Sequence, residues 1–552
     1  MTMREWVKRN TAILWAMVIG AFLFICVYGV HILNPTYVDW MITGGDRPQH
    51  YLGWVAYRNS RWFFPIGLTD QLSYPSKTSV IFTDSIPLLA VFFKLFSPLL
   101  PHRFQYFGIW GLLTFVLNGA FSAKILQKYM KSDLQVILGS VFYILSFQVL
   151  QRMFAHTALA GHWLILWAIC LLVYRDRMSY RRKMGAWLSL GAVSSAVHLY
   201  LLLMCGIVLL GFLLVEIVEQ RADRLRTRFL RTVGYLLSFV GAAAAVIALL
   251  GGFSSGMSAV NGGIGAYSLN LNGFINPQWH GQLLRTYTQL DTQHEGFSYL
   301  GAGILFMLLC TGIELAVKSN RENIRKYSPL WLGVTLAFCI AFVLAVFPTV
   351  TFGDEIIKHF IVRSFMLKVW GTFRASGRIA WICVYLFFLF ALCGDYRIVS
   401  ARRKSMVLAV ALILQLVDLS GFMVEKHTLW TTNYTYYPLL IQDNWDTLWN
   451  EGEAGHLAVM DDYSMDKHCD LVFWALDRGI SVNKFTFARD QGEDMLSPEA
   501  TGAEWQDGTI YVWDREGFTP VPDAGIYYYD LDARFVVGYT RQIPGLAMWK
   551  EG

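Results

Sequence analysis

The chain has 552 residues, of which 55% are hydrophobic and 15% aromatic, while only 16% are charged. Its mean hydropathy is +0.40. Soluble globular proteins carry about 25% charged residues, so this composition excludes an ordinary soluble enzyme and predicts a polytopic membrane protein.

The first apolar run, AILWAMVIGAFLFICVYGVHIL, follows Arg4, Lys8 and Arg9. It is longer than the core of a signal peptide and shows no small-residue cleavage site, so we expect a retained first transmembrane helix. Seven of the eight cysteines lie in apolar segments and only Cys469 lies outside them. This distribution excludes an extracytoplasmic disulfide framework within one chain.

A long polar loop, VDWMITGGDRPQHYLGWVAYRNSRWFFPIGLTDQLSYPSKTSVIFTDSIP, runs from Val38 to Pro87. Its four carboxylates are Asp39, Asp46, Asp70 and Asp84. The segment that closes the loop, DSIPLLAVFFKLFSPLLP, contains three prolines and a lysine in a largely apolar run. We expect this segment to lie along the outer membrane interface rather than to span the membrane.

Further apolar segments of spanning length recur along the chain, near residues 105–123, 134–150, 161–174, 184–217, 232–251, 299–317, 329–348, 379–396 and 405–424. One threading places 24 of the 46 Lys and Arg residues at the N-terminus and in short loops on a single side, which the positive-inside rule assigns to the cytoplasm. It requires residues 184–217 to form a tight hairpin that turns near His198. The N-terminus is then cytoplasmic, about eleven crossings follow, and everything after about Gly421 lies outside.

The C-terminal part has a different composition. From Glu425 to Gly552 there are 9 basic and 22 acidic residues, a net charge of −13. The runs HLAVMDDYS, GTIYVWD and GIYYYDLDARFVVGYT alternate as strands do, and CDLVFWALDRG is typical of a helix. We therefore expect an α-helical transmembrane domain over residues 1–424 and a soluble extracytoplasmic α+β domain over residues 425–552.

The outer ends of the predicted crossings collect polar side chains that are able to face one extracytoplasmic cavity. They are Asp39, Asp46, His50, Asp84, His156, His162, His198, His280, His294, Glu295, Asp354, Glu355, Arg374 and Arg378. The predicted cytoplasmic loops are short and hold little beyond basic residues, so we look for chemistry on the outer side.

The predicted architecture resembles the GT-C superfamily of lipid-linked-sugar glycosyltransferases. The shared features are a large outer loop with an acidic residue near its start, an interfacial helix that closes the loop, about eleven crossings and a C-terminal outer domain. The likeness covers the whole chain. Seven short motifs more specifically resemble an uncharacterised bacterial GT-C-like family of integral membrane proteins. They are GGDRPQHYLGW, RNSRWFFPIG, VIFTDSIPLLAVFFKLFSPLLP, HTALAGHW, LNGFINP, EGFSYLG and FRASGR.

The resemblance implies a glycosyltransferase in the bacterial plasma membrane. Such an enzyme moves a sugar from a polyprenyl phosphate or diphosphate carrier to a cell-envelope glycan or polymer on the outer face. Its partners would be this donor, the acceptor and membrane lipid, with no nucleic acid. The transfer needs a carboxylate as general base on the acceptor and cations that stabilise the departing phosphate.

Asp46 stands where the superfamily has its first-loop acidic residue, which makes it the candidate catalytic base. It precedes His50 by four residues, so a helix would place both side chains on one face, where His50 or Arg58 would orient the carboxylate. A helix cap is the structural alternative for Asp46, and Asp84 either caps the interfacial helix or takes part in the site. Pro48 interrupts the turn and a second acidic residue of some members is missing, so we expect no cofactor, with a divalent metal left open.

The remaining candidates are substrate-binding residues at the outer ends of later crossings. His156 and His162 flank a predicted helix start, where an interfacial anchor or a core histidine is the alternative, and no two histidines have zinc-protease spacing. Glu295 lies in EGFSYLG. Arg374 and Arg378, four residues apart in FRASGR, would present two guanidinium groups to the carrier phosphate. Snorkelling to lipid headgroups is their structural alternative.

Two other functions remain open at the level of the sequence. A transporter or flippase of lipid-linked saccharide would show internal repeats and polar groups deep in its spans, whereas we find no repeat, and Asp418, the clearest intramembrane acid, is predicted near an outer end. A scaffold that displays its acidic C-terminal domain would need no polar cavity.

Overall fold

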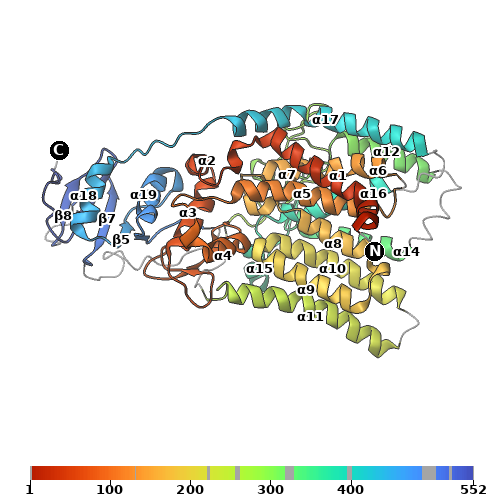
Figure 1. Ribbon diagram of the computed structural model, residues 1–552, viewed down its shortest axis with the longest axis horizontal. Helices are drawn as coiled ribbons and strands as arrows, with labels where there is room; N and C mark the ends of the chain where they lie inside the picture. The colour runs from red at the N-terminus through yellow and green to blue at the C-terminus, as the bar shows by residue number, and fades with distance from the viewer. Residues whose placement is uncertain are drawn as a thin grey trace. The chain divides into compact units, whose positions relative to one another are not determined.

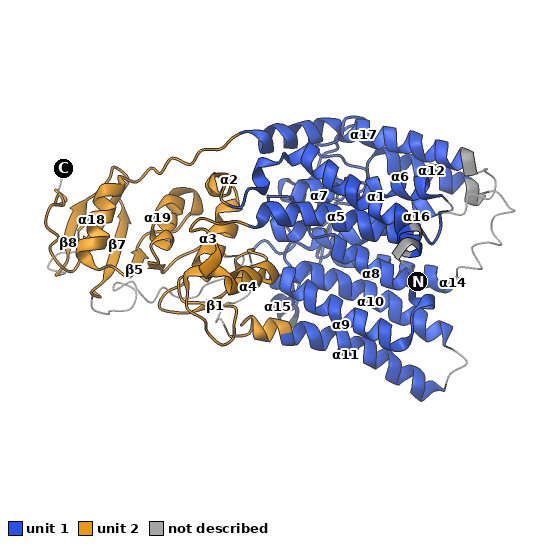
Figure 2. Cartoon of the chain, viewed as in Figure 1, with its two compact units in different colours: residues 1–35, 106–245, 261–432 blue, residues 36–105, 246–260, 433–552 orange. Residues whose placement is uncertain are grey.

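The computed structural model describes residues 3–130, 132–220, 224–254, 262–316, 328–393, 401–487, 505–520 and 525–550. The chain divides into two compact units (Figure 2). Unit 1 comprises residues 1–35, 106–245 and 261–432, and unit 2 comprises residues 36–105, 246–260 and 433–552. The first loop therefore groups with the C-terminal part of the chain, and the domain boundary expected after residue 424 stays a prediction.

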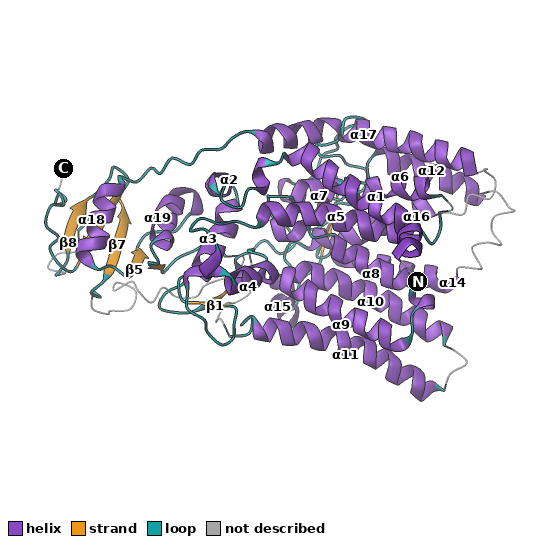
Figure 3. Ribbon diagram, viewed as in Figure 1, coloured by secondary structure: helices purple, strands orange, loops and turns teal. Residues whose placement is uncertain are grey.

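Unit 1 is built almost entirely from helices (Figures 1 and 3). These are α1 (Met3–Tyr28), α5 (Phe107–Leu126), α6 (Asp133–Ile144), α7 (Phe147–Arg152), α8 (Trp163–Val173), α9 (Tyr180–Val197), α10 (Leu199–Glu219), α11 (Leu225–Leu249, which ends in unit 2), α12 (Ala302–Ala316), α14 (Ser328–Val346), α15 (Ser364–Thr372), α16 (Trp381–Cys393) and α17 (Ala401–Thr431). Short 3-10 helices are η1 (His31–Leu33), η4 (Thr157–Ala160), η5 (Arg175–Arg177), η6 (Asp291–Gly296) and η8 (Ser376–Ala380), and β3 (Thr349–Phe352) pairs with β4 (Glu355–His359) in an antiparallel hairpin.

Within the described residues, eight helical segments are long and apolar enough to cross a membrane, and two shorter apolar helical segments cover residues 157–173 and 302–313. These segments coincide with apolar runs that the sequence marked, so the chain has the character of a multi-pass membrane protein. The number of crossings, expected to be about eleven, stays a prediction. All eight cysteines are free, in keeping with a packing role.

Small residues allow helices of unit 1 to approach closely. A Cβ atom on Gly20 of α1 would lie 2.5 Å from the carbonyl oxygen of Phe115 in α5, and one on Gly119 would lie 2.4 Å from the carbonyl oxygen of Ala16. Only glycine fits at such distances, and small residues at helix interfaces are the usual means of close packing in membranes. Contacts between α1 and α5 are accordingly extensive.

The predicted hairpin between residues 184 and 217 is confirmed as two helices that break at His198. The residue is extended (φ −164°, ψ 135°), and its Nδ1 accepts a hydrogen bond of 3.1 Å from the backbone N–H of Tyr200. His198 thereby satisfies one of the unpaired amides at the start of α10. Helices α9 and α10 then run side by side (Figure 1).

The N-terminus of α12 is capped by side chains of a different helix. Asp418 of α17 accepts hydrogen bonds from the backbone N–H of Ala302 (2.8 Å) and from the hydroxyl of Tyr299 (2.7 Å), and Gln415 Oε1 accepts from the N–H groups of Gly303 (3.0 Å) and Ile304 (3.3 Å). Both side chains are fully buried. The intramembrane acid that the sequence marked is therefore engaged in holding α12.

Unit 2 contains the first loop. Its elements there are α2 (Asp39–Ile42), α3 (Arg47–Asn59), β1 (Leu68–Thr69), β2 (Thr78–Ser79), η2 (Val80–Phe82), α4 (Pro87–Leu95) and η3 (Ser97–Leu99). Helix α4 has 9 residues, far fewer than the roughly twenty that a crossing needs. This length agrees with the expectation that the segment does not span, and its place at the membrane interface stays a prediction.

The C-terminal part of unit 2 is a mixed sheet with two helices (Figure 3). The helices are α18 (Gln442–Gly452) and α19 (Met465–Asp477), and the strands are β5 (His456–Val459), β6 (Ser481–Val482), β7 (Thr509–Asp514), β8 (Tyr527–Asp530) and β9 (Phe535–Tyr539). The sheet order is β6-β5-β7-β9-β8, with β5 parallel to β6 and β7 and the other pairs antiparallel. The strands and the helix expected from the alternating runs are present, whereas α18 and β6 were not anticipated.

Candidate functional site

A partly buried carboxylate in unit 1 is surrounded by basic side chains from three segments. Glu295 in η6 lies within 3.1 Å of Arg152 Nη2 at the end of α7, and it accepts hydrogen bonds from Nε (3.1 Å) and Nη2 of Arg378 in η8. His156 and His294 approach its other oxygen to 3.8 Å and 3.7 Å. We call these five residues the Glu295 cluster.

The backbone brings the cluster together because two sequence motifs pack glycine against glycine. A Cβ atom on Gly296, next to Glu295, would lie 2.8 Å from Cα of Gly377, next to Arg378. Arg152 also donates a hydrogen bond of 2.7 Å to the backbone carbonyl of Glu295. A side chain from α7 thus fixes the turn that carries the carboxylate. The segments EGFSYLG and FRASGR therefore meet at this point.

The electrostatics of the cluster favour an ionised Glu295. Burial raises the pKa of this carboxyl, but the nearby His156 and the charges of Arg378 and Arg152 outweigh burial and hold the pKa well below its ordinary range. Burial lowers the pKa of His156, Glu295 opposes this effect, and the charges of Arg378 and Arg152 add to the lowering, so the pKa stays below its ordinary value. His156 is therefore neutral near pH 7, and two arginines facing one carboxylate leave an excess of one positive charge.

The second predicted arginine, Arg374, is placed differently from Arg378. Its guanidinium lies 5.9 Å from the ring centroid of Tyr267, and it contacts no carboxylate among the described residues. Tyr200 organises this segment, because its hydroxyl accepts a hydrogen bond of 2.8 Å from the N–H of Ala375 and its ring lies 5.2 Å below the guanidinium of Arg378. The two predicted phosphate ligands thus flank one turn, and only Arg378 is already paired.

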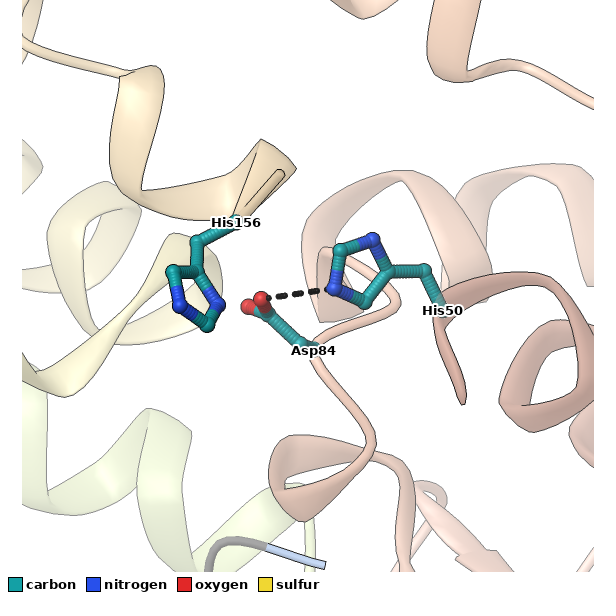
Figure 4. A group of neighbouring side chains, drawn as sticks. All are labelled: His50, Asp84 and His156. Carbon is teal, nitrogen blue, oxygen red and sulfur yellow. Dashed lines mark ion pairs between the residues drawn. The ribbon is translucent and has the colours of Figure 1, made fainter. Parts of the chain in front are cut away.

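A second pair of candidate residues lies within unit 2. His50 Nε2 and Asp84 Oδ2 are 3.1 Å apart and point toward each other (Figure 4), with the imidazole fully buried and the carboxylate 14% exposed. The hydroxyl of Ser85 donates a hydrogen bond of 2.7 Å to the backbone carbonyl of His50. A Cβ atom on Gly53 would lie 2.5 Å from Cβ of Thr83, so α3 needs glycine there to accept the turn that carries Asp84.

The capping alternative for Asp84 is wrong. The N-cap residue of α4 is Ile86, which offers no side-chain hydrogen bond, and Asp84 has a positive φ of 57°. A non-glycine residue in this conformation costs on the order of 1–3 kcal/mol and is typical of functional sites. Asp84 is therefore held in a strained backbone with its carboxylate against a buried histidine.

Asp46 occupies the N-cap position of α3 but makes no side-chain capping hydrogen bond, and it is exposed. Arg58, expected to orient Asp46, donates instead to four backbone carbonyls between Ser97 and His102, two at 2.8 Å and two at 3.2 Å. This guanidinium fastens α3 to the chain that follows η3. Asp39 accepts a hydrogen bond of 3.0 Å from the N–H of Tyr436, so its carboxylate holds the chain around Tyr436.

His162 has the surroundings of a core histidine. It is fully buried, and its Nδ1 lies 2.6 Å from the hydroxyl of Tyr385, which in turn lies 3.1 Å from Ser146 Oγ. The ring of Trp381 packs at 4.6 Å from the imidazole and at 5.8 Å from the guanidinium of Arg152. His162 therefore supports the wall behind the Glu295 cluster.

Sequence reasoning missed three residues that build this region: Arg152, Tyr200 and, as a partner of Glu295, His294. Arg152 ends an apolar run and so resembles a snorkelling arginine. A usable signal was present, because an arginine on the side predicted to be outer runs against the positive-inside rule. The two arginines around Glu295 make the cluster unsuited to a cation, and metal dependence of the chain stays untested.

Comparison with known proteins gives one family match. Residues 17–420 match a family model described as a domain of unknown function, DUF6311. No curated protein matches the chain.

Solved structures of an oligosaccharyltransferase from Archaeoglobus fulgidus are similar at low identity. The apo form gives a TM-score of 0.44 at 13% identity over 87% of this chain and 65% of that chain. The form tethered to an acceptor peptide gives a TM-score of 0.47 at 12% identity, over 98% of this chain and 75% of that chain. The complex of AglB with an inhibitory peptide and a dolichol-phosphate gives a TM-score of 0.47 at 12% identity, over 99% of this chain and 75% of that chain. This chain thus spans less than two thirds of the length of the apo structure's chain.

Proposed function

The chain belongs to the DUF6311 family, and from that premise we propose that it is a GT-C-type glycosyltransferase of the bacterial plasma membrane. It takes a sugar from a polyprenyl phosphate or diphosphate carrier and transfers it to a cell-envelope glycan or polymer on the outer face. The multi-pass helical architecture and the basic groups around Glu295 support this proposal.

The excess of positive charge beside an apolar helix carries the proposal. The Glu295 cluster has two arginines for one carboxylate, and Arg374 contacts only an aromatic ring within the described residues. Arg378 lies in the segment that continues into the candidate span 376–393. Uncompensated guanidinium charge at such a place is costly, and an anionic ligand removes the cost. Guanidinium groups bind phosphate in a bidentate manner, and a lipid-linked phosphate is an anion that a membrane supplies.

The chemistry of transfer assigns roles to these groups. The bond between the sugar C1 and the carrier phosphate oxygen breaks, the electron pair stays on that oxygen, and Arg374 and Arg378 stabilise the growing negative charge. The acceptor oxygen bonds to C1, and its proton passes to a carboxylate. Asp46, exposed and without a capping bond, remains the proposed base. Asp84, oriented by His50, is the second candidate.

No observation within the described residues favours the transporter alternative. Asp418, the clearest intramembrane acid of the sequence, is occupied by amides of Leu283 and Ala302 and by the hydroxyl of Tyr299. A carboxylate so engaged is a poor carrier of ions or protons. The scaffold alternative accounts for Arg374 only as an arginine that reaches lipid headgroups.

The test uses the full chain in lipid nanodiscs with undecaprenyl phosphate as the ligand. Arg374→Gln removes a charge-assisted contact worth about 1.5–3 kcal/mol, so we expect the Kd for this ligand to rise about tenfold to a hundredfold. Arg374→Lys should restore little of the loss because a point charge does not replace a planar fork.

Arg285→Gln, at an exposed arginine of the same unit, is the matched control and should leave the Kd unchanged. Sugar composition of the envelope and lipid-linked saccharides are measured in parallel in cells with and without the protein. Absence of undecaprenyl phosphate binding together with identical saccharide profiles would overturn the proposed function.

A further inference from the structure

A hairpin of unit 1 exposes large apolar side chains on both of its faces. All five residues of β4 are exposed, and the adjacent Ile356 and Ile357 are each 58% exposed. Since successive residues of a strand point to opposite faces, neither face of β4 is covered. We define the hairpin surface by the exposed apolar residues of β3, β4 and α15 and the chain between them. They are Phe352, Ile356, Ile357, Phe360, Ile361 and Val369.

The hairpin surface is firmly built. The side chain of Asn270 donates a hydrogen bond of 2.6 Å to the carbonyl of Gly353 and accepts one of 3.1 Å from the N–H of Gly353. Gln293 donates a hydrogen bond of 2.8 Å to the hydroxyl of Thr351. A two-stranded hairpin is marginal on its own, so these buried side chains hold it in place. A fixed apolar surface of this kind is typical of a binding site and unfavourable in water.

The surface lies on the connection between two candidate spans, 329–346 and 376–393, and so at the membrane. A row of stacked rings leads from it toward the arginines. Phe360 stacks on Phe347 at 5.8 Å, and Phe347 stacks on Trp370 of α15 at 5.0 Å. Four residues later the chain reaches Arg374. Three exposed basic residues, Lys358, Arg363 and Lys368, lie on the same segment.

From these observations we infer that the hairpin surface binds the isoprenoid tail of the donor while Arg374 binds its phosphate. The inference rests on the proposed function and extends it to the lipid part of the substrate. Both exposed faces of β4 carry large apolar side chains, so either face offers contact to an apolar chain. Branched and aromatic side chains suit a branched isoprenoid, and the neighbouring cations suit its anionic head.

Two isoprenoid phosphates of different length separate the tail from the head. Undecaprenyl phosphate and geranyl phosphate share the head, so their affinity ratio reports contacts with the tail. The variant Ile356→Ser/Ile357→Ser removes apolar area from the hairpin surface, and we expect about a tenfold loss of affinity for undecaprenyl phosphate. The affinity for geranyl phosphate should stay unchanged.

The matched control is Leu237→Ser/Val240→Ser on α11, where both side chains are also exposed, at 64% and 50%, and it should leave both affinities unchanged. Thermal unfolding and size-exclusion profiles establish that each variant is folded, and Ile361→Ser serves as a second variant if the double change fails to fold.

The outcomes separate the two proposals. A wild-type protein that prefers undecaprenyl phosphate while the double Ser variant keeps the same preference would overturn the tail site and leave the proposed function standing. Equal wild-type affinity for undecaprenyl phosphate and dioleoyl phosphatidic acid would overturn the choice of an isoprenoid. A wild-type protein that binds none of these phosphates would overturn both proposals.

Discussion

Replacing Glu295 by Gln tests whether this partly buried carboxylate is the counter-ion on which this part of unit 1 depends. The change preserves the size of the side chain and removes its charge. Arg152 and Arg378 are only 4% and 11% exposed, so both guanidinium groups would lose a charged partner in a poorly solvated place. Removing one partner of a buried ion pair costs about 3–5 kcal/mol, and we expect the free energy of unfolding to fall by that amount.

The measurement is reversible unfolding of the full chain in mixed micelles with increasing denaturing detergent, followed by tryptophan fluorescence. Glu355→Gln is the matched control, because this side chain is exposed and its loss of charge should change stability by less than about 0.5 kcal/mol. A fall for Glu295→Gln that is no larger than for the control would refute the reasoning.

The same variant also tests the link to phosphate. Without the carboxylate the cluster has two positive charges where it had one, so it should bind an anion more tightly if its arrangement survives. A ligand at a hundred times its Kd stabilises the folded state by about 2.7 kcal/mol. Undecaprenyl phosphate should therefore restore much of the stability lost in Glu295→Gln, and a failure to restore any would argue against phosphate binding at this cluster.

Four further predictions follow from the structure. In Asp46→Asn, transfer in reconstituted membranes should fall by roughly two to four orders of magnitude with normal expression, because the acceptor proton loses its base; near-normal transfer would move the role to the second candidate. His156 has a pKa below its ordinary value when folded, so the unfolded chain binds more protons and stability should drop as pH falls through about 6.5; in His156→Gln, unfolding curves between about pH 5 and 7.5 should lose this dependence. Gly296→Ala places a Cβ atom 2.8 Å from a backbone carbon and should destabilise by about 1–3 kcal/mol in the same unfolding assay. Cysteines at Arg61 and Asp507, both exposed, should react with an impermeant reagent from the outside of intact cells, and protection of both would refute the predicted topology.

Charge and hydropathy along the sequence anticipated the main features of unit 1. The positive-inside rule forced a hairpin near residue 198, and the structure breaks the helix there, with His198 capping the next helix. The same rule predicted that the segment after Asp84 does not span the membrane, and α4 is too short to cross. These successes depend on local composition, which a single sequence displays directly.

The candidate site was anticipated less well, because its contacts join distant segments. The sequence marked Glu295 and Arg378 separately, but nothing local indicates that they pair across 83 residues or that Arg152 joins them across 143. Asp84 was weighed as a helix cap because it precedes Pro87, while the pairing with His50 depends on a turn with positive φ that spacing does not reveal. In the C-terminal part, β6 has only two residues, too few for an alternating pattern.

The capping of α12 by α17 has a consequence for how the protein is made. Ala302 is synthesised 116 residues before Asp418, whose carboxylate accepts the hydrogen bond from the Ala302 amide. Until α17 is synthesised, the first amides of α12 lack these acceptors, and unsatisfied amides are disfavoured in hydrocarbon. We therefore expect the first amides of α12 to depend on water at the membrane surface at first, and the helix to reach its final packing only after α17 has been made. A chain that stops before Gln415 would lack both capping side chains.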